Sequence, residues 1–136
     1  MGIKYEGKDF LKKQSVDHKS PLANSFRYAG RGILRVFRSE RSFRLQILAF
    51  ILVVIAGFIF RITGIEWILI LIAGSTVLVS EMINTAVEYI IDLVTEEYRI
   101  LAGHIKNVTA GAVLVSAIIA AIVGLIVFVP YFLEYI

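Results

Sequence analysis

The sequence contains no cysteine, only two prolines, one tryptophan and two histidines. Without cysteine the chain can form neither a disulfide nor a thiolate metal site. It also lacks a G-x-x-x-x-G-K-[ST] phosphate loop, a G-x-G-x-x-G motif after a strand, and an H-E-x-x-H zinc motif. Residues 1–6 have no apolar core, so we expect no signal peptide. The motifs of soluble nucleotide-binding and zinc enzymes are therefore absent.

Apolar residues, in contrast, are abundant. They make up 58% of the 136 residues and the mean hydropathy is +0.81, well above the average of water-soluble proteins. The excess lies in three long runs, which predicts an all-α integral membrane protein with three transmembrane helices. We expect a polar connection at residues 95–107, and we expect Pro130 to end the third span. The predicted spans are residues 43–60, 67–94 and 108–129.

The region before the first span is basic. Residues 1–19 carry mixed charge without periodicity, which predicts a flexible cytoplasmic tail followed by one membrane domain at 20–136. Ser20 and Pro21 suit the start of a helix. We expect this amphipathic helix, at about 20–41, to lie on the membrane surface. Its apolar side carries Leu22, Phe26, Ile33 and Phe37, and its basic side carries Arg27, Arg31, Arg35 and Arg38.

The distribution of cations predicts the orientation. Eleven of the fourteen lysines and arginines lie in the N-terminal region up to Arg44, at the start of the first span, and Arg99 and Lys106 lie between the second and third spans. Only Arg61 lies on the opposite side. Because cations favour the cytoplasmic side, we expect the N-terminus and the inner end of the second span to be cytoplasmic.

Polar residues interrupt the second span near its inner end. Glu81, Asn84, Glu88 and Asp92 are spaced i, i+3, i+7 and i+11, which places them along one side of a helix. Carboxylates this close to hydrocarbon cost several kcal/mol to bury without a partner. We expect the stripe at the level of the lipid headgroups, where both water-soluble and lipid-soluble molecules have access.

This arrangement suits one chemistry better than its alternatives. Carboxylates beside lysine and arginine can hold Mg²⁺ with a polyphosphate, and a further carboxylate can take a proton from a hydroxyl during phosphoryl transfer. A small oligomeric channel or proton-linked transporter, and a purely structural membrane protein, are the alternatives. The stripe covers only the inner half of the second span, which disfavours a channel. By spacing alone Glu40 is a salt-bridged surface acid and His104 a polar loop residue.

The residues from Glu81 to Glu88, followed by Asp92, Lys106 and Ala110 to Leu114, closely resemble the signature of the prokaryotic diacylglycerol kinase family. Its members are small three-span membrane enzymes that phosphorylate lipid alcohols. The resemblance covers about residues 24–130. Three stretches look more like the undecaprenol kinase branch of the family, and they are residues 38–43, 65–67 and 124–130.

The resemblance implies an ATP- and Mg²⁺-dependent kinase of the bacterial plasma membrane. The implied acceptor is undecaprenol, with diacylglycerol as the alternative, and no nucleic acid partner is expected. Family members are homotrimers in which neighbouring subunits share active sites, and the small residues of the third span are compatible with such packing.

Matching positions carry the implied roles. Glu81 corresponds to the general base that acts on the lipid hydroxyl, and Asn84 to a polar active-site residue. Glu40 and Glu88 correspond to the Mg²⁺-binding carboxylates. Asn107 stands where the family usually has aspartate, so it keeps a hydrogen-bonding side chain and loses a charge. The implied nucleotide contacts are Tyr28, Glu40, Glu88, Glu97, Tyr98, Arg99, Lys106 and Asn107.

Overall fold

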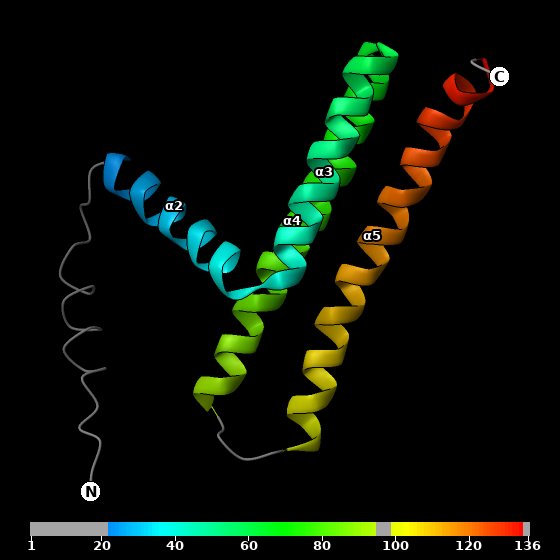
Figure 1. The fold of residues 1–136 in the computed structure, drawn as a ribbon. Helices are drawn as coiled ribbons and strands as arrows, with labels where there is room; N and C mark the ends of the chain where they lie inside the picture. The colour runs from blue at the N-terminus through cyan, green and yellow to red at the C-terminus, as the bar shows by residue number, and fades with distance from the viewer. Residues whose placement is uncertain (1–21, 95–98, 135–136) are drawn as a thin grey trace, which may run out of the picture. The chain divides into compact units, whose positions relative to one another are not determined.

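The computed structural model describes residues 22–94 and 99–134. The predicted tail at 1–19 and the predicted helix start at Ser20 and Pro21 lie outside these residues. The described chain is helical, without strands, and falls into two units that divide after Arg35. Its helices are α2 (Leu22–Ser39), α3 (Arg41–Phe60), α4 (Gly64–Val94) and α5 (Ile100–Glu134), as Figure 1 shows.

The first unit contains most of α2. Leu22 and Phe26 leave 80% and 77% of their surface exposed, as expected of apolar side chains that need a further partner. The guanidinium groups of Arg27 and Arg31 lie 5.8 and 6.0 Å from the centre of the Tyr28 ring, within the range of cation–π attraction.

The helices α3, α4 and α5 are each long and apolar enough to cross a membrane. Their 20, 31 and 35 residues correspond to about 30, 46 and 52 Å at about 1.5 Å per residue. A bilayer has a hydrocarbon core of about 30 Å, so α4 and α5 extend beyond it. Most of their large apolar side chains are exposed, which suits contact with lipid. The predicted all-helical fold with three apolar spans is confirmed.

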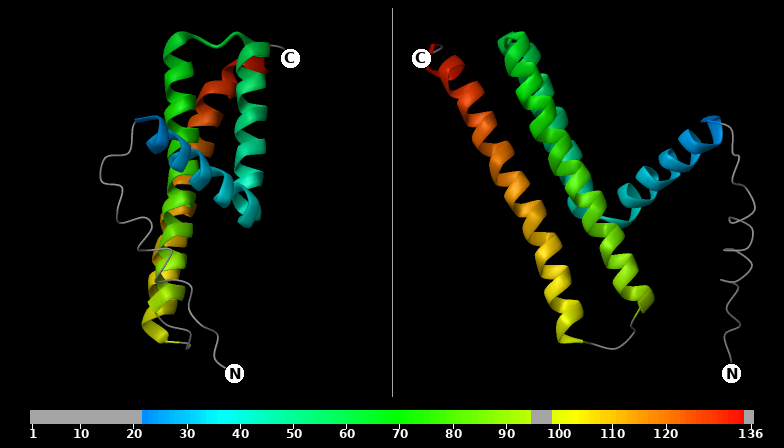
Figure 2. Two further views of the ribbon diagram at one scale, coloured as in Figure 1. Left: turned by 90° about the vertical axis from the view of Figure 1, so that its left-hand side faces the viewer. Right: turned by 180° about the vertical axis from the view of Figure 1, so that it is seen from behind.

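The helix α4 packs against both α3 and α5 (Figures 1 and 2). Close approach to α3 depends on two glycines. A Cβ atom at Gly74 would overlap the Phe50 ring, and one at Gly57 would lie 2.8 Å from Trp67 Cη2. Figure 2 shows the end of α5 at the same end of the bundle as the turn between α3 and α4.

That turn is built by local hydrogen bonds. Arg61 has φ 51° and ψ 49°, and the Ile62 N–H donates to the Gly57 carbonyl at 3.2 Å, a Schellman-type ending of α3. Thr63 and Glu66 then form a capping box at the start of α4, with the Thr63 N–H donating to Glu66 Oε2 at 2.7 Å. The Tyr131 hydroxyl donates to the same oxygen at 2.8 Å, which joins α5 to the turn.

Two sequence-based boundaries were wrong. Most of the expected connection at 95–107 is helical, because α5 already begins at Ile100. Polar side chains such as Lys106 are compatible with a helix, and Lys106 forms an ion pair with Asp92 of α4. Pro130 does not end α5, which continues to Glu134. Proline removes one backbone donor, and membrane helices tolerate that loss when their surroundings compensate for it.

Candidate active site

Polar side chains follow one another along α4 from Glu81 toward its C-terminal end. Glu81 and Asn84 are buried, with 6% and 9% of their surface exposed, and Glu88 is half-buried. Asn84 Nδ2 donates a hydrogen bond to Glu88 Oε1 at 3.2 Å. The two residues are four positions apart, so their side chains meet on adjacent turns of the helix. The structure therefore joins two of the predicted site residues directly.

The carboxylate of Glu81 is held from α3. Ser42 Oγ donates to Glu81 Oε1, and Gln46 Nε2 donates to Glu81 Oε2 at 3.1 Å. No lysine or arginine of the described chain forms a salt bridge with Glu81. The backbone is held as well, since the Thr85 hydroxyl donates to the Glu81 carbonyl at 3.0 Å and Thr85 is only 1% exposed. Glu81 is thus a buried acid supported by neutral donors.

Two buried acceptors beside these groups have no donor. Asn84 Oδ1 and Gln46 Oε1 accept no hydrogen bond from the described part of the chain. Unsatisfied buried polar atoms are rare in folded proteins and each calls for an explanation, such as an ion or a ligand. Both atoms belong to residues that bond a carboxylate of α4, so the unsatisfied acceptors gather at the same place as the acids.

Glu40 lies between α2 and α3. Its backbone is extended, with φ −100° and ψ 118°, and its half-buried side chain forms no hydrogen bond with described residues. Arg44 Nη1 fixes this corner by donating to the carbonyls of Phe37 and Arg38 at 3.2 and 3.0 Å. The salt bridge that spacing alone predicts for Glu40 does not occur within residues 22–94 and 99–134. The same residues contain no cluster of three or more acidic or histidine side chains suited to a metal ion.

Asp92 and Lys106 connect α4 to α5. Lys106 Nζ lies 2.9 Å from Asp92 Oδ1, and the two side chains are 40% and 65% exposed. An ion pair this exposed contributes little to folding stability, so Lys106 remains accessible to another anion. Asn107 is exposed at the next position of α5.

The remaining predicted nucleotide contacts are less well placed. Tyr28 lies on α2 in the first unit, whereas the acids of α4 lie in the second. Arg99 is exposed immediately before α5, where its carbonyl accepts a hydrogen bond from the Gly103 N–H at 3.1 Å. Glu97 and Tyr98 lie outside the described residues.

Sequence reasoning missed the α3 side of the site. Ser42 and Gln46 are uncharged polar residues four positions apart at the start of α3, and this spacing is the one signal that marks them. A second contact, from the Tyr89 hydroxyl to Ser39 Oγ at 3.1 Å, joins α4 to the end of α2. None of these pairings follows from spacing, because each depends on how two helices align.

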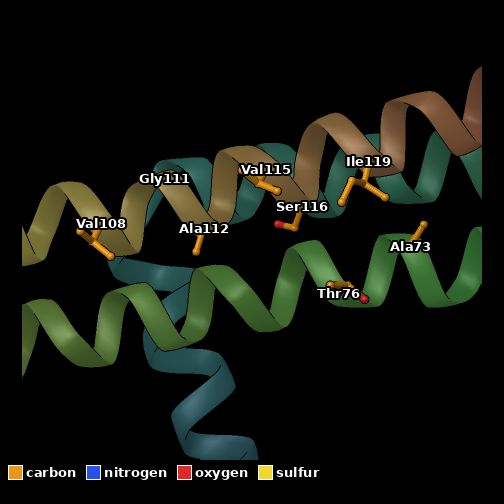
Figure 3. A pocket seen from close by; sticks show the side chains of 8 residues that line it. All are labelled: Ala73, Thr76, Val108, Gly111, Ala112, Val115, Ser116 and Ile119. Carbon is orange, nitrogen blue, oxygen red and sulfur yellow. The ribbon is translucent and has the colours of Figure 1, made fainter.

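Two apolar grooves border the helices. One of about 450 Å³ lies between α4 and α5, where small side chains such as Ala112 and Ser116 lie opposite Ala73 and Thr76 (Figure 3). The other, of about 710 Å³, is lined by α3, α4 and α5. Gln46 is the one polar side chain among its lining residues, so this groove begins next to the carboxylate of Glu81.

The level of Glu81 in the bundle follows from its contact with α3. Ser42 is the second residue of a helix about 30 Å long, which matches the hydrocarbon core of a bilayer. Beyond Glu81, α4 extends past the start of α3 (Figure 1). Glu81 therefore lies level with one end of the apolar layer, and Asp92 lies farther along the extension.

The chain matches the family model of prokaryotic diacylglycerol kinase over residues 27–128. It is 40% identical to the undecaprenol kinase of Bacillus subtilis over 119 residues, which are 85% of this chain and 97% of that protein. It is 35% identical to a diacylglycerol kinase of Synechocystis, covering 84% of this chain and 66% of that protein. Identity to the diacylglycerol kinase of Escherichia coli K12 is 28%, over 77% of this chain and 86% of that protein.

Proposed function

Because the chain belongs to the prokaryotic diacylglycerol kinase family and is a membrane lipid kinase, we propose that it transfers the γ-phosphoryl group of ATP to undecaprenol, giving undecaprenyl phosphate. The observation that carries the proposed chemistry is the buried, hydrogen-bonded carboxylate of Glu81 at one end of the apolar layer. Undecaprenol is favoured over diacylglycerol because the match to an undecaprenol kinase spans nearly all of that protein. Diacylglycerol is the second candidate, since further relatives are diacylglycerol kinases.

In this mechanism Glu81 acts as the general base. The alcohol reaches it from the lipid side, where the groove that begins at Gln46 accommodates part of the hydrocarbon chain. Glu81 takes the hydroxyl proton while the alcohol oxygen forms a bond to the γ-phosphorus. The bond from that phosphorus to the bridging oxygen breaks, ADP leaves with the electron pair, and Glu81 later returns the proton to water.

Mg²⁺ is expected at Glu40 and Glu88. The donors fit, because Mg²⁺ prefers carboxylate and carbonyl oxygens, and the unsatisfied Asn84 Oδ1 lies beside the hydrogen bond to Glu88. When bound, the ion would neutralise phosphate charge. Lys106 has three donors, so its bond to Asp92 leaves others for phosphate. The remaining proposed nucleotide contacts are Tyr28, Glu97, Tyr98, Arg99 and Asn107.

A homotrimer with shared sites completes this proposal. The Glu40 carboxylate has no partner among the described residues, and these residues contain no three-membered acidic cluster. Groups from a neighbouring copy would complete such a partial site. Mixing two inactive variants, Glu40→Gln and Glu81→Gln, should then restore part of the activity in mixed trimers. Mixtures that stay inactive, although the subunits co-assemble, would contradict a shared site.

The proposed orientation places the acids on the cytoplasmic side. It is supported by the excess of cations before α3 and by the need of the site for cytosolic ATP. A membrane-impermeant thiol reagent should label the variant Asn107→Cys in inverted membrane vesicles and leave it unlabelled in intact cells. Labelling of this cysteine in intact cells would place the site on the outer side, where cytosolic ATP has no access, and would overturn the mechanism.

The activity is tested with purified protein in lipid micelles, γ-labelled ATP, Mg²⁺, and undecaprenol and diacylglycerol in competition. We expect label mainly in undecaprenyl phosphate. Glu81→Gln should lower kcat by about 10²- to 10⁴-fold, the usual contribution of a general base. Glu134→Gln is the matched control, because Glu134 is an exposed acid in the last turn of α5, at the opposite end of that helix from Lys106. Near-normal turnover of Glu81→Gln would refute the assignment, and preference for diacylglycerol would favour the second candidate.

A further inference from the structure

Both oxygens of the Glu81 carboxylate accept hydrogen bonds from side chains of α3. Ser42 donates to Oε1 and Gln46 donates to Oε2 at 3.1 Å. Because the two donors are four residues apart on α3, they lie on the same face, one turn above the other. A carboxylate bonded at both oxygens from a single rigid helix has little freedom to rotate.

The two hydrogen bonds from α3 leave the Glu81 carboxylate able to accept a proton. Each carboxylate oxygen has two lone-pair positions, and each receives one donor from α3. One position on each oxygen therefore remains for an alcohol proton. Both donors are uncharged, so no salt bridge within the described chain competes with the alcohol proton for the carboxylate.

The charged side chains near Glu81 have other hydrogen-bond partners. Glu88 is bonded by Asn84 and Lys106 by Asp92, while Arg44 is engaged by the carbonyls of Phe37 and Arg38. Within the described chain, Ser42 and Gln46 are the side chains that bond the Glu81 carboxylate.

We propose that Ser42 and Gln46 are positioning residues that hold Glu81 in the orientation needed to take the proton of the lipid alcohol. This inference rests on the proposed role of Glu81 as general base. Ser42 acts through Glu81. Gln46 also acts through Glu81. In addition it lines the 710 Å³ groove, so it lies between the apolar groove proposed for the lipid chain and the base.

The sharpest test compares Ser42→Thr with Ser42→Val, which have nearly the same shape and differ in the hydroxyl. We expect Ser42→Thr to keep kcat within about threefold of wild type. Ser42→Val and Gln46→Leu should each lower kcat by about tenfold, because small misplacements of a reacting group reduce rates strongly. KM for MgATP should stay within about twofold in all three variants. KM for the lipid should rise in Gln46→Leu alone.

Ser116→Ala is the matched control. Ser116 is 8% exposed, and its hydroxyl donates to the Val113 carbonyl of its own helix at 2.8 Å rather than to a carboxylate. The control should retain normal kcat. Trp67 fluorescence and the size of the detergent-solubilised assembly identify any variant that misfolds. If Ser42→Val does not fold, Ser42→Thr and Gln46→Leu still test the proposal.

The outcomes separate this inference from the proposed function. Equal kcat in Ser42→Thr and Ser42→Val, together with normal kcat in Gln46→Leu, would overturn the positioning role even if Glu81→Gln is inactive. A parallel rise in KM for MgATP would assign these residues to structure rather than to the base. An active Glu81→Gln would refute the function on which the inference rests.

Discussion

Replacing Gly74 by alanine should weaken both the packing of α3 on α4 and the reaction. A Cβ atom at this position would overlap the Phe50 ring, and Phe50 Cζ would lie 3.2 Å away. Ordinary carbon contacts are about 3.5–4.0 Å, so the ring or the helix must move by about 1 Å. Overpacking of this kind costs about 1–3 kcal/mol, and alanine recovers about 1 kcal/mol of helix propensity. The expected net destabilisation is therefore about 0–2 kcal/mol.

The effect on activity follows from the position of Phe50 one turn after Gln46. The hydrogen bond from Gln46 to Glu81 is already 3.1 Å long, so a displacement of α3 by about 1 Å would break it. We expect kcat to fall by about tenfold, since the base loses one of its two supports. The assay combines detergent-induced unfolding with γ-labelled ATP turnover at saturating lipid.

A compensating change and a control make the reasoning falsifiable. Phe50→Leu gives the new methyl group room, so the double variant should recover stability and kcat relative to Gly74→Ala. Gly64→Ala should leave both unchanged, because a Cβ atom there meets nothing within 4 Å. A Gly74→Ala variant with unchanged or higher stability and normal kcat would show that the α3–α4 distance does not control the site.

Three further outcomes are expected. Lys106→Met should raise KM for ATP by about 10- to 100-fold, because a charged contact to phosphate is lost. Detergent-induced unfolding should be unchanged, because the ion pair of Lys106 with Asp92 is exposed. An unaltered KM for ATP would show that Lys106 does not contact the nucleotide. Tyr131→Phe should lower the resistance to detergent-induced unfolding, because α5 loses its hydrogen bond to Glu66. The value of kcat should stay normal, since Glu81 lies far along α4 from Glu66. A loss of kcat in the folded variant would contradict the independence of the site from this bond. Chelation of divalent ions should abolish turnover until Mg²⁺ is added back, and metal-independent turnover would exclude the proposed role of Glu40 and Glu88.

Much of the fold could be read from local patterns. Three apolar runs predict three spans because each span must bury its own backbone hydrogen bonds, whatever surrounds it. The contact between Asn84 and Glu88 is likewise local, since a spacing of four brings side chains together on any helix. Helix ends were harder to predict. Pro130 and the polar residues after Ile100 predict helix boundaries that the structure does not have, because neither feature stops a helix that other contacts support.

The roles of the site residues stay predictions, whereas the structure shows which side chains surround Glu81 and Asp92. The resemblance directed attention to Glu81, and nothing in its neighbouring sequence indicates that Ser42 and Gln46, about 40 positions earlier, bond its two oxygens. The same holds for the bond from Lys106 to Asp92. These contacts require a particular alignment of one helix along another.

The sequence by itself determined that the chain spans a membrane with three helices and carries acids on one side of the second, because hydropathy and the 3.6-residue period act within single helices. The tertiary structure decided which groups those acids meet. Gly74 beneath Phe50 and Gly57 beneath Trp67 set the approach and alignment of α3 on α4, while Tyr131 on Glu66 ties α5 to the turn. Because such alignment depends on the fit of distant side chains, only the packed helices show that Glu81 is held by Ser42 and Gln46.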